Sequence, residues 1–147
     1  MRIFLLLLSF TLLSTSPLNY FDNLKSEVKL QAQECLVTVF FDNSTCVKCH
    51  LEPNYYLNQI ESNCGKKNFK VLGILKCDRD IELKVFKKDI NWQYQLIRDD
   101  GKCRKKLGVF DTAIMTVFNY NGDKKLSIST GNMKNNSKKI INFISQN

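Results

Sequence analysis

Apolar residues along the chain fall into two patterns, which predict strands and helices in alternation. Continuous apolar runs rich in β-branched residues predict buried strands over residues 36–41 and 69–75, and a short extended piece over 94–97. Apolar positions at helical spacing predict helices over residues 46–62, 80–89 and 101–107, with a further short helix before Cys35. The middle of the chain therefore has the pattern of an α/β protein.

The last third of the chain predicts a hairpin followed by a helix. Two apolar runs, residues 114–118 and 125–129, flank Asn121-Gly122, a dipeptide that tolerates the positive φ angles of a hairpin turn. Ser137 is expected to cap a closing helix whose isoleucines pack on the sheet. The two strands should pair antiparallel, next to the parallel pair formed earlier in the chain.

The order of these elements predicts a central mixed sheet with helices on both faces, because parallel pairs need helical crossovers and short connections keep neighbours adjacent. This order of elements is that of the thioredoxin fold. The chain has 147 residues, 44% of them hydrophobic and 24% charged. That size and composition suit one compact domain and exclude both two full domains and a disordered chain.

The N-terminus predicts export. Met1-Arg2 is a short basic start, an apolar run follows over residues 3–13, and the small residues Ser14 to Ser16 suit a cleavage site. The apolar run has about half the ~20 residues that a spanning helix needs, so we expect no stable membrane span after cleavage. The sequence thus predicts a signal peptide over 1–17, a helical extension over 18–35 and a thioredoxin-like domain over 36–147, in a periplasmic or extracellular protein.

The charge of the chain is basic but dispersed. Twenty-two Lys and Arg against 14 Asp and Glu give a formal net charge of +8. The basic residues come in scattered pairs, with one denser group from Lys102 to Lys106. Scattered pairs are typical of a solvated surface, and an exported protein rarely meets nucleic acid, so no nucleic-acid partner is expected.

The candidate chemistry lies in Cys46-Val-Lys-Cys49, directly after the first strand and at the start of a helix. Unpaired N–H groups and the positive end of the helix dipole stabilise a thiolate at the first sulfur. Cys46 is therefore the expected nucleophile, and Cys49 is placed to resolve a mixed disulfide formed there. A structural disulfide without catalysis is the plainer alternative.

Several segments resemble the exported thioredoxin-like thiol-disulfide oxidoreductases of TlpA/ResA type, and together they cover roughly residues 36–145. The segments are 40–53, 88–101, 108–122 and Thr130-Gly131. The resemblance implies an extra helix and extended piece, exchange of dithiol and disulfide with protein partners, an upstream electron donor or acceptor, and no bound cofactor. It implies that Cys46 attacks, that Cys49 resolves, and that Glu52 helps proton transfer.

The sequence departs from that family near the motif and opposite it. Thr45 replaces the usual aromatic residue, and Val47-Lys48 replaces a proline-containing pair. Ala113 takes the place of a proline that these folds hold in cis, and a cis bond before Ala costs ~3 kcal/mol, so a trans peptide is expected there. The resemblance suggests that Thr112 and Ala113 line the substrate groove.

Two other readings of the motif remain open at this point. Cys46-Val-Lys-Cys49-His50 is also a formal c-type haem attachment sequence, with Met115 or Met133 as the sixth ligand. Cys46, Cys49 and His50 could instead ligate copper or zinc, although a fourth ligand would have to be remote. Visible absorption by the purified protein separates haem from a colourless thiol pair.

Four further cysteines allow three pairings, among which the sequence does not choose: Cys35, Cys64, Cys77 and Cys103. Cys35 begins the first strand and Cys64 ends the helix that follows it. Both are expected at the end of the sheet away from the motif, which favours a bond between these two.

Overall fold

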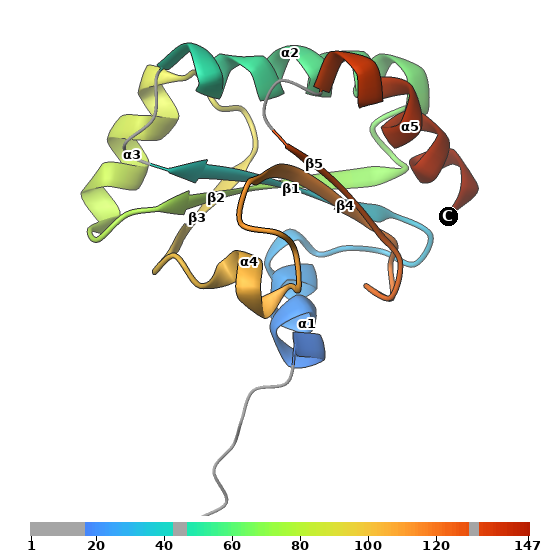
Figure 1. Cartoon of the computed structure of the whole chain (residues 1–147), viewed down its shortest axis with the longest axis horizontal. Helices are drawn as coiled ribbons and strands as arrows, with labels where there is room; N and C mark the ends of the chain where they lie inside the picture. The colour runs from blue at the N-terminus through green and yellow to red at the C-terminus, as the bar shows by residue number, and fades with distance from the viewer. Residues whose placement is uncertain (1–16, 43–46, 130–132) are drawn as a thin grey trace, which may run out of the picture.

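The computed structural model describes residues 17–42, 47–129 and 133–147, with side chains over 20–42, 50–129 and 136–147 (Figure 1). Helices and strands alternate along most of this length. In chain order the elements are α1 (Pro17–Val28), β1 (Cys35–Asp42), α2 (Val47–Cys64), β2 (Phe69–Lys76), α3 (Asp80–Asp89), β3 (Gln95–Asp99), α4 (Cys103–Lys106), β4 (Ala113–Phe118), β5 (Lys125–Ser129) and α5 (Met133–Gln146).

The five strands form one mixed sheet in the order β3-β2-β1-β4-β5. β1 pairs with β2 in parallel from Cys35 opposite Phe69 to Asp42 opposite Lys76, and β3 continues the parallel half. β4 runs antiparallel to both β1 and β5. The expected parallel and antiparallel pairs are confirmed, and they share β1 as the central strand.

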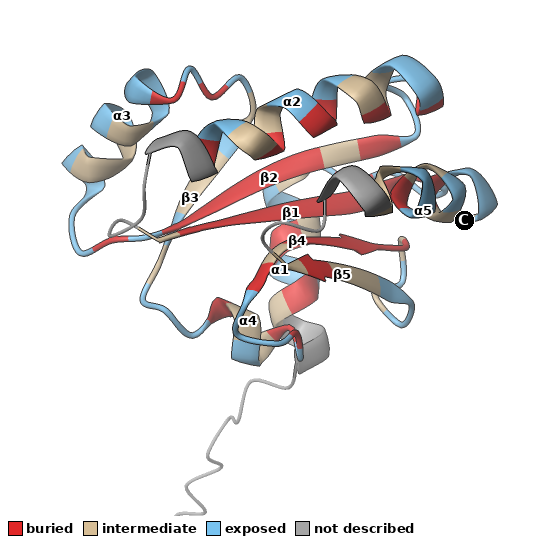
Figure 2. Ribbon diagram, turned by 45° about the horizontal axis from the view of Figure 1, so that its top comes forward, coloured by how far each residue is buried: buried red, intermediate tan, exposed pale blue. Residues whose placement is uncertain are grey.

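Alternate residues of β1 point into two separate cores. Val37, Val39 and Phe41 face a core shared with α2 and α5, whereas Leu36 and Phe40 face a second core shared with α1 and α4. Figure 2 shows β1 and β2 buried along nearly their whole length, with the helices buried only on the sides that face them. Both faces of the sheet are thus covered, which explains why the strands are continuous apolar runs.

The N-terminal helix belongs to the folded unit. Phe21, Leu24 and Leu30 are buried in the second core. The turn between β4 and β5 approaches the same helix at Gly122, whose φ is +76° and where a Cβ atom would lie 2.5 Å from the Phe21 ring. Glycine is therefore required at Gly122 by backbone conformation and by space. The helix expected over 18–35 corresponds to α1 only as far as Val28, because residues 29–34 are not helical and Cys35 already belongs to β1.

One element boundary differs clearly from the sequence prediction. α5 begins at Met133, so Ser137 lies within the helix rather than at its N-cap. Asn and Ser differ little in helix propensity, so nothing in 133–136 prevents the helix from starting a turn earlier. The predicted signal peptide lies, except for Pro17, outside the described residues. Among the helices that are described, none is long and apolar enough to cross a membrane.

Candidate functional site

The ends of four strands meet at one edge of the sheet. β1, β2 and β3 are parallel and end at Asp42, Lys76 and Asp99. β4 runs the other way and begins at this edge with Ala113. The segment with the cysteine motif leaves β1 here. Ligands of open α/β sheets bind outside the carboxyl ends of the strands, so this edge is the candidate site.

The two motif cysteines are described only in part. Cys46 lies outside the described residues and directly precedes Val47, the first residue of α2. Cys49 belongs to the first turn of α2, and the position of its side chain is not described. That turn contains no acidic residue to offset the positive end of the helix dipole. The helix start thus has the charge that favours a thiolate.

The neighbours of the motif on α2 are Glu52 and His50. Glu52 is half-buried and lies one turn after Cys49. Burial, and after it the Glu52 carboxylate, raises the pKa of Tyr56. His50 is 6% exposed, and its ring packs edge-on against Phe41 at 5.5 Å and Phe86 at 5.0 Å between centroids. As an axial ligand, His50 would have to leave this aromatic packing.

The other ligands proposed for a haem or metal site are placed as follows. Met115 is completely buried in the core between the sheet and α2, and the side chain of Met133 is not described. A methionine in that core would have to unpack before it could bind iron. Among the described side chains, no three His, Cys, Asp or Glu residues are grouped closely enough to hold a metal ion.

Thr112 and Ala113 differ in what they offer to a substrate. The described residues contain no cis peptide bond, so the Thr112–Ala113 bond is trans, as the sequence predicts. Ala113 is completely buried; its N–H donates to the Phe110 carbonyl at 3.0 Å, and its carbonyl accepts from Arg104 Nε at 2.9 Å. Thr112 is exposed, and its main chain makes no hydrogen bond to another described residue. Thr112 is thus the residue of the two with accessible main-chain groups.

A charged cavity of about 560 Å³ opens at this edge of the sheet. Its wall combines four carboxylates, two cations and one thiol, from Asp42, Lys76, Cys77, Asp78, Glu82, Arg104 and Asp111. Arg104 Nη2 lies 3.6 Å from Asp42 Oδ2. In the sequence, Arg104 stands within the basic group from Lys102 to Lys106, where nothing distinguishes it from its lysine neighbours.

The four remaining cysteines are buried free thiols. Burial raises the pKa of Cys35 to about 11 and that of Cys103 to about 12, and it also raises the pKa values of Cys64 and Cys77. Thiols with raised pKa values remain protonated at neutral pH and are poor nucleophiles. None of the four has the environment of a reactive cysteine.

The expected bond between Cys35 and Cys64 is absent, although the two residues are neighbours as predicted. Cys64 contributes to the raised pKa of Cys35, and both lie in the core at the amino end of β1. The Cys64 thiol instead donates to the Ile141 carbonyl at 3.8 Å. The sequence pattern therefore located the pair correctly but was wrong about its chemical state.

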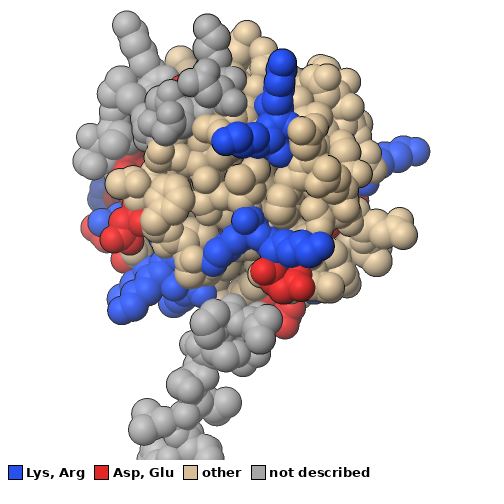
Figure 3. Space-filling view, turned by 45° about the vertical axis from the view of Figure 1, so that its right-hand side comes forward, with Lys and Arg blue, Asp and Glu red and all other residues tan. Residues whose placement is uncertain are grey.

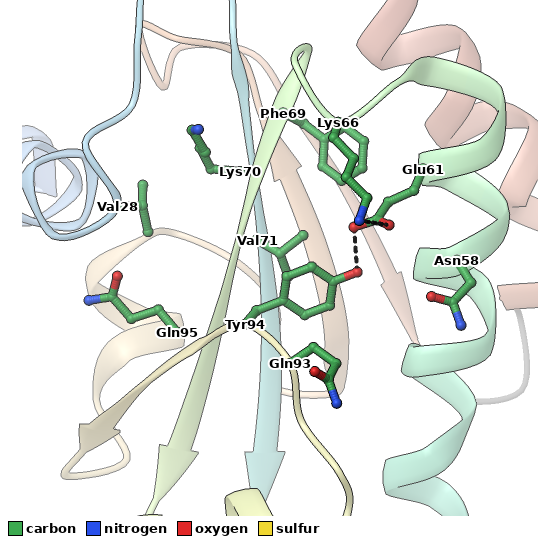
Figure 4. A pocket seen from close by; sticks show the side chains of 10 residues that line it. All are labelled: Val28, Asn58, Glu61, Lys66, Phe69, Lys70, Val71, Gln93, Tyr94 and Gln95. Carbon is green, nitrogen blue, oxygen red and sulfur yellow. Dashed lines mark hydrogen bonds and ion pairs between the residues drawn. The ribbon is translucent and has the colours of Figure 1, made fainter.

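A second cavity, of about 590 Å³, lies at the opposite end of the sheet. In Figure 4, Tyr94 points toward Glu61 of α2, and Lys66 lies beside the same carboxylate. Tyr94 Oη donates to Glu61 Oε1 at 2.7 Å, and Lys66 Nζ lies 3.4 Å from Glu61 Oε2. Burial and the neighbouring carboxylate raise the pKa of Tyr94. This cavity is far along the strands from the motif.

Lys and Arg side chains are dispersed over the molecular face in Figure 3, with neutral residues between them. Several basic residues are engaged within the protein. Lys25 lies over the Tyr120 ring at 4.0 Å, and Lys70 pairs with Glu34 at 3.5 Å. The basic charge of the chain is thus spread over the surface and is partly used in local contacts.

No protein-family model and no curated protein matches the chain. Solved structures do resemble it. A secreted disulfide oxidoreductase of Mycobacterium tuberculosis superposes with a TM-score of 0.53 at 10% identity, covering 83% of this chain and 86% of that one. A protein described as thiol:disulfide interchange protein DsbE from Chlorobium tepidum gives 0.58 at 13% identity, covering 82% and 84%.

The thioredoxin domain of a thiol-disulfide oxidoreductase from Bacteroides vulgatus gives a TM-score of 0.55 at 13% identity, covering 74% of this chain and 80% of that one. At such identities the likeness lies in the arrangement of the backbone rather than in shared side chains. Together with the strand order and the helices on both faces of the sheet, these superpositions show that the chain has the thioredoxin-like fold.

Proposed function

We propose that the protein is an exported thiol-disulfide oxidoreductase that exchanges dithiol and disulfide with protein partners through Cys46 and Cys49. The observation that carries this proposal is the position of the motif. It follows the central strand and enters α2, at the edge where the strand ends meet. The similar solved proteins are described as oxidoreductases of this class, one of them secreted, which supports the proposal.

The state of the other cysteines supports the same assignment. The pKa values of Cys35, Cys64, Cys77 and Cys103 are all raised by burial. By contrast, the start of a long helix without acidic residues lowers the pKa of a thiol. The start of α2 is therefore where we expect a cysteine thiolate, since burial disfavours ionisation of the four described thiols.

In the reducing direction, the Cys46 thiolate attacks one sulfur of a substrate disulfide. A mixed disulfide forms, and the second substrate sulfur leaves as a thiolate that takes up a proton. The Cys49 thiolate, after Glu52 accepts its proton, attacks the Cys46 sulfur and releases the reduced substrate. Two electrons pass to the substrate, and the motif becomes a disulfide. A dithiol donor restores the motif by the reverse exchange, and an oxidising partner drives the same steps backward.

The test is reduction of insulin by dithiothreitol in the presence of the purified protein. We expect the wild type to accelerate the reaction and Cys46→Ser to abolish the acceleration. Expressed in its own compartment, without dithiothreitol, Cys49→Ser should accumulate mixed disulfides with its protein partners, because attack at Cys46 persists without a resolving thiol. Activity retained in Cys46→Ser but lost in Cys49→Ser, or no trapped partner in Cys49→Ser, argues instead for a structural disulfide.

A further inference from the structure

Arg104, on the short helix α4, contacts residues of two different strands at the candidate site. Its Nε donates to the Ala113 carbonyl at 2.9 Å, and its Nη2 lies 3.6 Å from Asp42 Oδ2. The guanidinium also lies over the Phe40 ring, 4.8 Å from the centroid. Its side chain is only 17% exposed. A planar guanidinium can satisfy these partners together, whereas the single ammonium group of a lysine cannot.

The helix that carries Arg104 is fixed at its start and at its end. The Asp99 carboxylate accepts hydrogen bonds from the N–H groups of Gly101 at 2.9 Å and Cys103 at 3.1 Å. Cys103 is completely buried. After the helix, Lys125 Nζ donates to the carbonyls of Leu107 and Gly108. Arg104 thus extends from a rigid base.

Arg104 joins Asp42, at the end of β1, to Ala113, at the start of β4, and these two residues have different roles at the site. Asp42 is the last described residue before the cysteine motif. The Ala113 carbonyl anchors the loop that leaves Thr112 exposed, with main-chain groups unbound within the described part of the chain. An anchored loop with open main-chain groups can hydrogen-bond an extended peptide. Without Arg104, the Ala113 carbonyl loses the charged donor that ties it to α4, and the loop loses its fixed distance from Asp42.

We propose that Arg104 is a positioning residue that fixes the Thr112–Ala113 loop relative to the end of β1, so that a protein substrate binds beside the cysteine motif. This inference rests on the proposed function. It makes a specific distinction between substrates. A protein disulfide needs the loop to hold its chain, whereas a small disulfide such as oxidised glutathione needs mainly the reactive thiol.

The test compares both substrates in Arg104→Met, which keeps an unbranched apolar side chain over Phe40 and removes every donor. We expect kcat/KM for insulin to fall about tenfold, mainly through KM, because a hydrogen bond from a charged donor is lost. The rate constant with oxidised glutathione should change less than about twofold. The matched control is Arg98→Met, which removes the same charge from an arginine that contacts Asp78 and Asp80 instead. We expect it to leave both rates unchanged.

Arg104→Lys separates position from charge and serves if Arg104→Met does not fold, which urea unfolding will show. We expect Arg104→Lys to lose activity on insulin selectively, although less than Arg104→Met. Full activity in Arg104→Lys, or an equal loss on both substrates in either variant, overturns the positioning role. A wild type that reduces neither substrate overturns the proposed function itself, and the inference with it.

Discussion

The carboxyl end of the parallel strands is lined by charged groups, whereas the amino end of β1 lies in an apolar core. At the amino end, Cys35 and Cys64 lie in an apolar core, and the nearby Tyr94 and Glu61 satisfy each other by a hydrogen bond. At the carboxyl end, charged groups line a cavity, and Arg104 joins two strand ends. Even at the carboxyl end, burial raises the pKa values of Cys77 and Cys103, so the surroundings that favour a thiolate are limited to the start of α2.

The difference comes from where a helix begins and where it ends. α2 starts at the carboxyl end of β1, so its positive N-terminus faces the motif, and it ends with Cys64 at the amino end. A helix C-terminus is the negative end and disfavours a thiolate. Cys49 in the first turn of α2 and Cys64 at its last residue thus stand at opposite ends of one helix dipole.

The largest expected effect tests the rigidity of the carboxyl end. Ala113→Pro removes the N–H that donates to the Phe110 carbonyl at a completely buried position. We expect the free energy of unfolding to fall by about 2–3 kcal/mol, with a loss of insulin reduction. Urea unfolding measures the change. Thr112→Ala, an exposed neighbour, is the control and should remain within about 0.5 kcal/mol of the wild type. An unchanged urea midpoint in Ala113→Pro contradicts the proposed anchoring.

A smaller effect concerns the buried thiols and alkaline pH. Because the pKa of Cys103 is raised to about 12 in the folded protein, the unfolded chain loses this proton first as the pH rises. The stabilisation is complete below the unfolded pKa of about 8.5 and is lost as the pH rises toward the folded pKa. The free energy of unfolding of the wild type should fall between about pH 8 and about pH 10.5. In Cys103→Ala we expect this fall to be smaller by on the order of 2 kcal/mol, because the titrating thiol is gone.

Unfolding in urea at the two pH values measures this difference. Leu107→Val is the matched control, because it opens a cavity in the same core without removing a titratable group. It should keep the full pH dependence of the wild type. Equal pH dependence in Cys103→Ala and in the wild type contradicts a protonated, buried Cys103.

The smallest expected effect tests whether residues at the amino end of the parallel strands contribute to stability but not to disulfide reduction. Tyr94→Phe removes the hydrogen bond to Glu61. We expect a loss of about 1 kcal/mol of stability and no change in insulin reduction. The exposed Tyr55 provides the control Tyr55→Phe, which should change neither quantity. A fall in activity in Tyr94→Phe without a fall in stability links the two ends of the sheet.

The sequence predicted most helices and strands because each has a signal in its own residues. Strands that are buried on both faces of the sheet must be continuous apolar runs, and a tight turn needs particular residues. The continuous runs of β1 and β2, and Asn121-Gly122 between β4 and β5, each carry their own signal. Ser137 was wrong as a helix start because Met133 and Lys134 are good helix formers and no Gly or Pro stands in 133–136, so the helix extends a turn before Ser137.

The candidate site was predictable only where one short segment contains it. The motif cysteines are close in sequence, so position and spacing were sufficient to propose them. Arg104 could not be found in this way, because its partners Asp42 and Ala113 come from distant strands and meet only in the fold. Its sequence neighbours suggested a solvated surface, and the anchoring of α4 by Asp99 explains why Arg104 turns inward.

The most direct test of the account is the alkylation rate of each cysteine in the fully reduced, folded protein. Iodoacetamide at about pH 7 reacts with thiolates, and mass spectrometry after digestion assigns the modified residue. We predict that Cys46 reacts at least about tenfold faster than Cys35, Cys64, Cys77 or Cys103. Modification of any of these four at the rate of Cys46, or faster, contradicts the claim that the fold reserves its reactive thiol for the start of α2.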